Sequence, residues 1–253
     1  MTDPAAPVGS VVRALRILDL VAQSEKPLTL SRIADELKIP KSTAHSILRD
    51  LVSESFLAPA DPAGYVIGLK AFEVGSAHLR LTSTVGVVAS ELARLTRALN
   101  ITSHYAILDG ADAVYLCKED PPGLGVQLAS SVGARLPAHL TAVGKTCLAW
   151  LPRDEVADHV VLSKAGQRHG ETSLKELAAE LDQVRERGYA FDDGEAALGI
   201  QCVAAPVFDT SGCRGAVGVS YLRDLPEPLD RISSMVMEAA ARATTMLGGR
   251  PRQ

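Results

Sequence analysis

The sequence predicts an α+β protein with two parts, an N-terminal winged helix-turn-helix and a larger domain with a mostly antiparallel sheet. Two short amphipathic helices separated by a three-residue break occupy residues 29–54, and a hairpin pattern follows them directly. From residue 101 onward, strand patterns are interspersed with separate helical segments, which is typical of α+β domains. We expect the winged helix at residues 8–69, a linker helix at 70–84 and a C-terminal domain at 85–250.

The composition indicates a globular protein without a membrane span. Of the 253 residues, 47% are hydrophobic and 22% are charged, which argues against disorder. No apolar stretch approaches the roughly 18 residues of a transmembrane helix, and the start of the chain lacks the pattern of a secretory signal. The four cysteines include no C-x-x-C pair, so no metal site is expected and a reducing compartment fits. We therefore expect a cytoplasmic protein.

The first helix is expected at residues 10–24, with Ser10 as its N-cap. Apolar residues at steps of three and four define its expected buried stripe, which consists of Val11, Ala14, Leu15, Leu18, Val21 and Ala22. The helix-turn-helix follows, with helices expected at 29–37 and 41–54. Pro40 suits the start of the second of these helices, where a missing N–H costs nothing.

The second helix of this motif has a polar face suited to reading DNA. Its residues off the apolar stripe carry short hydrogen-bonding or basic side chains, and they are Lys41, Ser42, Thr43, His45, Ser46 and Arg49. Arg13 and Arg16 on the first helix add candidate phosphate contacts, as does Arg49. The net charge of −4 lends no support to DNA binding. The alternative is an ordinary helical hairpin with a solvated face, and the wing at residues 56–67 favours the DNA-binding interpretation.

The C-terminal domain is expected to alternate strands and helices. The strand candidates are Thr102–Leu108, Ala113–Lys118, Val126–Val132, Gln201–Phe208 and Gly215–Leu222. The helix candidates are Val85–Leu99, Thr141–Leu151, Leu174–Gly188 and Leu229–Leu247. Ser173 suits the cap and Gly188 the stop of the third helix, so its boundaries are the best defined by local chemistry.

The helix start at Thr141 is a candidate anion site. Its first amide groups, on Ala142, Val143 and Gly144, are expected to be free to bind a carboxylate, although a plain capped helix is the alternative. The run GKT from Gly144 resembles the end of a phosphate-binding loop. His139 stands where that motif needs glycine, so we reject nucleotide binding and expect no cofactor.

Two further clusters are weaker candidates. The run DDGE from Asp192 holds three carboxylates, but it lacks spaced partner ligands, so a solvated turn is favoured over a metal site. Cys202 and His139 form a conceivable nucleophile and base, which would make the chain an enzyme with an appended winged helix. No third residue can be named to orient the base, so we assign no catalytic residue.

Three blocks of the chain resemble the IclR family of bacterial transcriptional regulators, in that family's order and spacing. The first block comprises VVRALRILDL from Val11, PKSTAH from Pro40 and the wing GYVIG from Gly64. The second is RLPAHLTAVGKTCLA from Arg135, and the third comprises GYAFDDGE from Gly188 and GIQCVAAPVFD from Gly199. Together they span nearly the whole chain.

This resemblance implies a winged helix joined by a linker helix to a GAF/PAS-like effector-binding domain. Members of the family bind small organic molecules and assemble as dimers or dimers of dimers. The family's ligand positions fall in this sequence on Ala142, Val143, Gly144, Asp192, Cys202, Gly218 and Ser220. On this basis we expect the segment 85–250 to bind an effector.

The sequence departs from the family pattern at four positions. Lys38 stands where the family usually has glycine in the helix–helix turn, so a positive φ there would cost about 1 kcal/mol. Ser46 and Val66 stand where basic residues are usual, which removes two phosphate contacts. The family usually has two serines on the late strand, and Gly218 stands at the position of the first. We expect the missing side chain to leave room in the ligand pocket for an aromatic ring.

The expected function is a DNA-binding transcriptional regulator, more often a repressor, that binds a double-stranded DNA operator and responds to a small organic effector. Aromatic acids or their amides are favoured as effectors, and aliphatic carboxylates are the other option. We expect no enzymatic activity and no membrane partner. The alternatives are an enzyme that uses Cys202, and a protein–protein module whose winged helix docks a partner.

Overall fold

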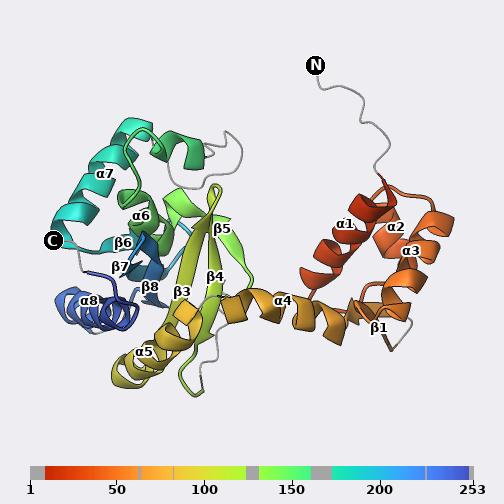
Figure 1. The fold of residues 1–253 in the computed structure, drawn as a ribbon, viewed down its shortest axis with the longest axis horizontal. Coiled ribbons are helices and arrows are strands. Elements are labelled where there is room, and N and C mark those ends of the chain that lie inside the picture. The colour runs from red at the N-terminus through yellow and green to blue at the C-terminus, as the bar shows by residue number, and fades with distance from the viewer. Residues whose placement is uncertain are drawn as a thin grey trace. The chain divides into compact units, whose positions relative to one another are not determined.

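The computed structural model describes residues 9–61, 64–81, 83–123, 131–160, 173–225 and 227–250. The chain forms two compact units, Met1–Thr82 and Ser83–Gln253, and each is described by itself. The expected α+β architecture is confirmed, with a helical winged unit followed by a unit built on a six-stranded sheet (Figure 1). The finer domain limits at residues 8–69, 70–84 and 85–250 stay a prediction.

The N-terminal unit has the helix–helix–helix–wing order that the sequence predicts. Its elements are α1 (Ser10–Ala22), α2 (Leu30–Glu36), α3 (Lys41–Ser53), the antiparallel strands β1 (Leu57–Ala60) and β2 (Gly64–Ile67), and α4 (Leu69–Leu81). Leu28 also pairs with Tyr65, so the segment before α2 is attached to the wing by backbone hydrogen bonds. The wing is therefore a fixed part of the unit.

Seven buried side chains form the core of this unit: Ile17, Val21, Leu28, Ile33, Ile47, Leu48 and Leu57. The stripe expected on the first helix is partly wrong, because Val11 is 70% and Leu15 is 55% exposed, whereas Ile17 is fully buried. Apolar residues at steps of three and four occur both on the face with Val11 and Leu15 and on the face with Ile17 and Val21. Only the packing of α1 in the folded unit decides which of these two faces is buried. Ser10 is the first helical residue rather than the cap, since Gly9 is the N-cap and no side chain caps this helix.

The turn between α2 and α3 requires a left-handed residue. Lys38 has φ of 52°, so the conformation for which glycine is usual is adopted here by a residue with a Cβ atom. The helices on either side are held by local bonds. Thr29 caps α2 by accepting the Arg32 amide at 3.3 Å, and the Ile39 amide donates to the Ala34 carbonyl at 3.0 Å.

The C-terminal unit contains one antiparallel sheet in the order β5-β4-β3-β8-β7-β6. Its strands are β3 (Thr102–Asp109), β4 (Asp112–Glu119), β5 (Arg135–Pro137), β6 (Ala190–Asp193), β7 (Ile200–Asp209) and β8 (Gly212–Leu222). The short edge strands β5 and β6 were not expected, because three or four residues show no clear alternation. The strand expected at Val126–Val132 falls mostly outside the described residues.

Helices cover both faces of this sheet (Figure 1). One face packs on α5 (Ser83–Leu99) and α8 (Leu229–Met246) through aliphatic residues such as Leu92, Val217 and Val236. The other face packs on α6 (Ala142–Ala149) and α7 (Leu174–Arg187) through smaller residues such as Ala204 and Ala216. Two short 3-10 turns, Ala138–Leu140 and Val156–His159, lie on either side of α6 in the sequence.

The helix ends in this unit confirm the predicted caps. Ser173 and Glu176 form a capping box at the start of α7, and Gly188 ends that helix with φ of 82°. Thr141 caps α6 by accepting the Gly144 amide at 3.1 Å. All eight residues of α6 are buried, so this short helix lies within the unit and brings its N-terminal end against the sheet. Within the described residues, no helix combines the length and apolar character of a membrane span.

Candidate DNA-binding surface and ligand site

The predicted polar face of α3 is largely exposed in the structure. Ala44, Ile47 and Leu48 face the core, whereas six residues turn away from it. Lys41, Ser42, His45, Ser46 and Arg49 are exposed and Thr43 is half-buried. The guanidinium of Arg49 lies 3.3 Å from the carboxylate of Asp50, the next residue of the helix. On α1, Arg16 is exposed and Arg13 is half-buried. These positions are compatible with DNA contacts.

In the C-terminal unit, side chains from four strands lie in one row across the sheet. Asp192 of β6 is directly opposite Cys202 of β7, Cys202 is opposite Ser220 of β8, and Ser220 is opposite Thr102 of β3. Directly opposed residues in antiparallel strands point to the same face. Cys202 packs with the cluster that includes α6, so the row lies on the α6 side. Three of the four were predicted, and Thr102 was missed.

The neighbouring row places His104 over Gly218. Gly218 is opposite both Ala204 and His104, and a Cβ atom on Gly218 would lie 2.8 Å from His104 Nε2. The same Cβ position would be 3.0 Å from a methyl group of Val143. The expectation that Gly218 leaves room for an aromatic ring is therefore wrong, because the imidazole and the start of α6 occupy that space. His104 was not predicted, and its contact with Gly218 follows from strand register.

The start of α6 differs in one respect from the predicted anion site. The amide of Gly144 is not available, because it donates to the Thr141 hydroxyl. A Cβ atom at Gly144 would lie 2.2 Å from the Ala138 carbonyl oxygen, so glycine is needed here for close packing. In the part of the chain that the structure describes, no hydrogen bond is found from the amides of Ala142 and Val143. Both residues are buried, so these two amides form the anion-seeking end of the helix.

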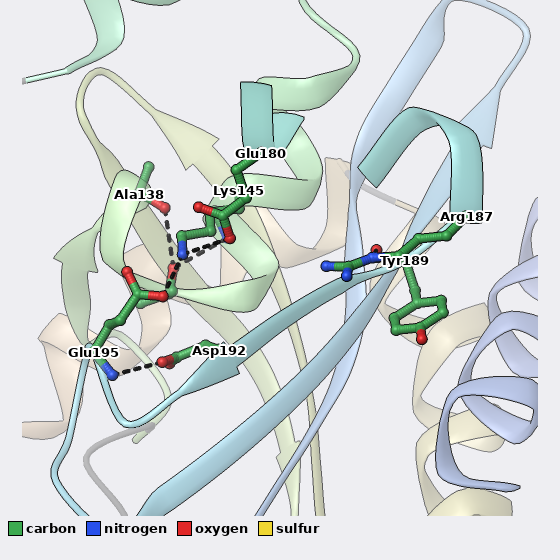
Figure 2. Close-up of polar contacts among 9 residues, drawn as sticks. Ala138, Lys145, Glu180, Arg187, Tyr189, Asp192 and Glu195 are labelled. Carbon is green, nitrogen blue, oxygen red and sulfur yellow. Dashed lines mark hydrogen bonds and ion pairs between the residues drawn. The ribbon is translucent and has the colours of Figure 1, made fainter. Parts of the chain in front are cut away.

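Lys145 is the least expected polar residue of this site. Its ammonium group lies 2.8 Å from Glu180 of α7 and 2.5 Å from Glu195 in the turn after β6 (Figure 2). The Lys145 side chain is 1% exposed and the two carboxylates are about one-third exposed or less. The GKT run resembles the end of a phosphate-binding loop, but its lysine forms buried ion pairs that connect α6 to α7 and to the turn after β6.

The three carboxylates of the DDGE run have separate partners. Asp192 accepts the backbone amide of Glu195 at 2.7 Å (Figure 2), while Asp193 pairs with Arg223 at 2.9 Å and Glu195 pairs with Lys145. Among the described residues, no group of three or more His, Cys, Asp or Glu is placed to hold a metal ion. Burial raises the pKa of Asp192 to about 6, and the nearby Glu195 charge adds to this effect. Asp192 therefore titrates just below neutral pH.

Cys202 is a thiol rather than a thiolate. Burial raises the pKa of Cys202 to about 12, and the Asp192 charge adds to the shift. Its sulfur lies 3.2 Å from the Ser220 hydroxyl. Because the thiolate is the nucleophilic form, this environment disfavours the alternative in which Cys202 acts as a nucleophile. The neutral thiol of Cys202 and the hydroxyl of Ser220 instead form a small polar surface that can hydrogen-bond a ligand.

A winged helix with an exposed polar recognition helix, followed by a sheet domain with a buried polar row, defines a transcriptional regulator with DNA-binding and ligand-sensing units. Comparisons with known proteins identify the family. The family model described as "Bacterial transcriptional regulator IclR C-terminal" matches residues 78–243. The model described as "IclR helix-turn-helix domain" matches residues 10–60. The chain belongs to the IclR family of bacterial transcriptional regulators, as its sequence motifs predict.

Individual relatives agree over almost the whole chain. The chain is 31% identical over 260 residues to the transcriptional repressor IclR of Escherichia coli (strain K12), covering 98% of this chain and 93% of the relative. It is 31% identical over 247 residues to the regulator KdgR of the same organism, covering 95% and 93%. The crystal structure of an IclR transcriptional regulator from Alicyclobacillus acidocaldarius matches with a TM-score of 0.79 at 27% identity, covering 96% and 100%. The chain is thus a transcriptional regulator with a DNA-binding helix-turn-helix and an effector-binding C-terminal domain.

Proposed function

We propose that this regulator is a cytoplasmic repressor that binds a pseudo-palindromic operator as a homodimer or a dimer of dimers. In this proposal Lys41, Ser42, Thr43, His45 and Ser46 face the major groove, and Arg13, Arg16 and Arg49 hold phosphates. The carrying observation is the exposed polar face of α3 next to a fixed wing. Two relatives, the E. coli IclR protein and the acetate operon repressor of Salmonella typhimurium (30% identical), are named as repressors, which supports this direction of regulation.

The exposed apolar patch on α1 supports the oligomeric state. Val11, Val12 and Leu15 are 70%, 44% and 55% exposed in a single copy. Apolar side chains gathered on one helix favour burial against a second molecule. One winged helix also makes few DNA contacts, and two linked copies raise operator affinity by increasing the effective concentration.

The proposed effector is a small molecule with one carboxylate. Its charge would meet the amides of Ala142 and Val143, and its remaining polar groups would meet Asp192, Cys202 and Ser220. Gly144 lets the start of α6 pack closely on the Ala138 backbone, and Gly218 lets the His104 and Val143 side chains approach β8. Effector binding regulates DNA affinity only if the ligand binds one arrangement of the domains more tightly than another.

The test uses the full chain and the DNA upstream of its own and adjacent genes. We expect nuclease protection of two half-sites related by a two-fold axis, and light scattering that gives the mass of a dimer or tetramer. A monomer at micromolar concentration would contradict the oligomeric proposal. Equal affinity for upstream DNA and unrelated DNA of the same length, at several salt concentrations, would contradict the operator proposal and favour a winged helix that docks a protein.

A further inference from the structure

Two cysteines of the C-terminal unit, Cys147 and Cys213, lie outside the residues assigned to the proposed effector site. Cys147 belongs to α6, is 5% exposed and packs in the cluster between that helix and the sheet. Cys213 is half-buried near the start of β8. The two residues are far apart in the sequence, so only the fold can bring their thiols together.

A β-bulge turns Cys213 toward α6. Ala216 packs on the α6 side of the sheet, so regular alternation along β8 would direct Arg214 to that side and Cys213 to the other. In the pairing of β8 with β7, however, the register passes from Gly215 directly to Cys213 and skips Arg214. Arg214 is the extra residue of the bulge and is exposed. Cys213 therefore takes the α6 side.

The C-terminal end of α6, which contains Cys147, lies over this part of the sheet. Phe208 of β7 is directly opposite Cys213, so the two side chains point to the same face. The Phe208 ring meets the Trp150 ring edge to face, with centroids 5.2 Å apart. Trp150 is the C-cap of α6, and its amide donates to the Cys147 carbonyl at 3.2 Å. The Cys147 thiol is in hydrogen-bonding contact with Cys213.

The surroundings of the two thiols differ in a way that sets the order of their reactions. The hydrogen bond with Cys213, together with burial, raises the pKa of Cys147 well above its usual value, so Cys147 keeps its proton. Cys213 is the more exposed of the two. Because oxidation of cysteine requires access, an oxidant meets Cys213 first and finds a second thiol beside it.

We propose that Cys147 and Cys213 are a redox modification site, at which a peroxide forms a reversible intramolecular disulfide between α6 and β8. First, Cys213 loses its proton and its sulfur attacks a peroxide oxygen. An S–O bond forms, the O–O bond breaks, and the released hydroxide leaves as water with the thiol proton.

The second step joins the two sulfurs. The Cys147 sulfur attacks the Cys213 sulfur, the S–S bond forms, and the S–O bond breaks. The Cys147 proton leaves with the hydroxyl group as a second water. The two thiols together lose two electrons and two protons, and the peroxide is reduced to water. In a reducing compartment such a bridge is transient, and a dithiol reverses it.

The experiment treats the full chain with a small molar excess of hydrogen peroxide. The protein is then denatured, its remaining thiols are alkylated with N-ethylmaleimide, and the products are measured by mass spectrometry. We expect the number of alkylated thiols to fall by two from the four of the sequence. A nonreduced peptide map should show the peptides of Cys147 and Cys213 joined, and dithiothreitol should restore all four thiols. The test needs neither effector nor DNA, so its outcome is independent of the proposed function.

Cys213→Ser should abolish the joined peptide. Cys117→Ser is the matched control, because Cys117 is also a half-buried cysteine of the same unit, and this variant should still form the bridge. If circular dichroism shows that Cys213→Ser does not fold, Cys213→Ala removes the same sulfur and the same peptide map is recorded.

Four results would overturn the inference. The native chain could keep all four thiols after peroxide treatment. It could lose thiols to sulfinic or sulfonic acid without a joined peptide. The joined peptide could contain Cys117 or Cys202 in place of either proposed cysteine. Finally, a nonreducing gel could show that the bridge joins two chains.

Discussion

The ammonium group of Lys145 in α6 lies 2.5 Å from the carboxylate of Glu195, in the turn that follows β6. With Glu180 of α7 at 2.8 Å, this lysine connects three elements that are far apart in the sequence. The same turn contains the Glu195 amide that donates to Asp192. The lysine therefore holds the segment that positions one of the proposed effector contacts.

Lys145→Met should lower the free energy of unfolding by about 2–4 kcal/mol, because it leaves two carboxylates without their cation in a largely buried site. Chemical denaturation of the full chain measures this. Arg135→Met is the control, since Arg135 pairs with Asp109 at 2.8 Å on an exposed surface and its loss should cost less than about 1 kcal/mol. Equal losses in the two variants would show that burial does not strengthen the Lys145 interactions.

The stability of the native chain should depend on the ionisation of Asp192. Its folded pKa of about 6 exceeds its usual value of 3.8, so the folded state binds this proton more tightly than the unfolded state does. The contribution of Asp192 is therefore fully present below about pH 4 and is lost as the pH rises through about 6. The shift corresponds to about 3 kcal/mol.

Denaturation of native and Asp192→Asn chains between about pH 4 and about pH 7 checks this dependence. Asp192→Asn should remove a decline in stability that the native chain shows over that interval. Parallel pH profiles for the two chains would mean that Asp192 titrates near its ordinary value. Asp193→Asn is a control, because Asp193 is exposed in the same strand.

Cys202→Leu should abolish the effector response and leave operator affinity within a few fold. The larger side chain would fill the space beside Ser220, whereas the DNA-binding face lies in the other unit. Operator titrations with and without effector measure both properties. Cys202→Ser keeps the size and the hydrogen-bonding capacity and should still respond. A normal response from Cys202→Leu would show that the effector binds elsewhere.

Substitutions on α3 and α1 should separate base contacts from phosphate contacts. Thr43→Ala or His45→Ala should weaken specific operator binding by about 1–3 kcal/mol for each lost base contact. Arg13→Ala should weaken binding to all sequences and reduce the salt slope by about one. Thr210→Ala changes an exposed threonine in the other unit and should have no effect. Unchanged operator titrations in the three α1 and α3 variants would contradict the proposed DNA surface.

Most of the fold could be predicted because the signals are local. The cap at Thr141, the capping box at Ser173 and the stop at Gly188 each depend on residues within one helical turn, and the structure confirms them. The positive φ of Lys38 agrees with the glycine that the family resemblance implies at this position. The strands β5 and β6 could not be predicted, since they are only three and four residues long and depend on pairing with longer strands.

The sequence by itself determined the architecture, the family and the residues of the recognition helix, because periodicity and local motifs carry that information. Tertiary structure alone decided which apolar stripe of α1 is buried, that Lys145 lies between two carboxylates, and that His104 fills the space over Gly218. These contacts depend on strand register and helix packing between residues far apart in the chain. Their geometry is absent from any local pattern, so the polar environment of the proposed effector site could be defined only by the folded chain.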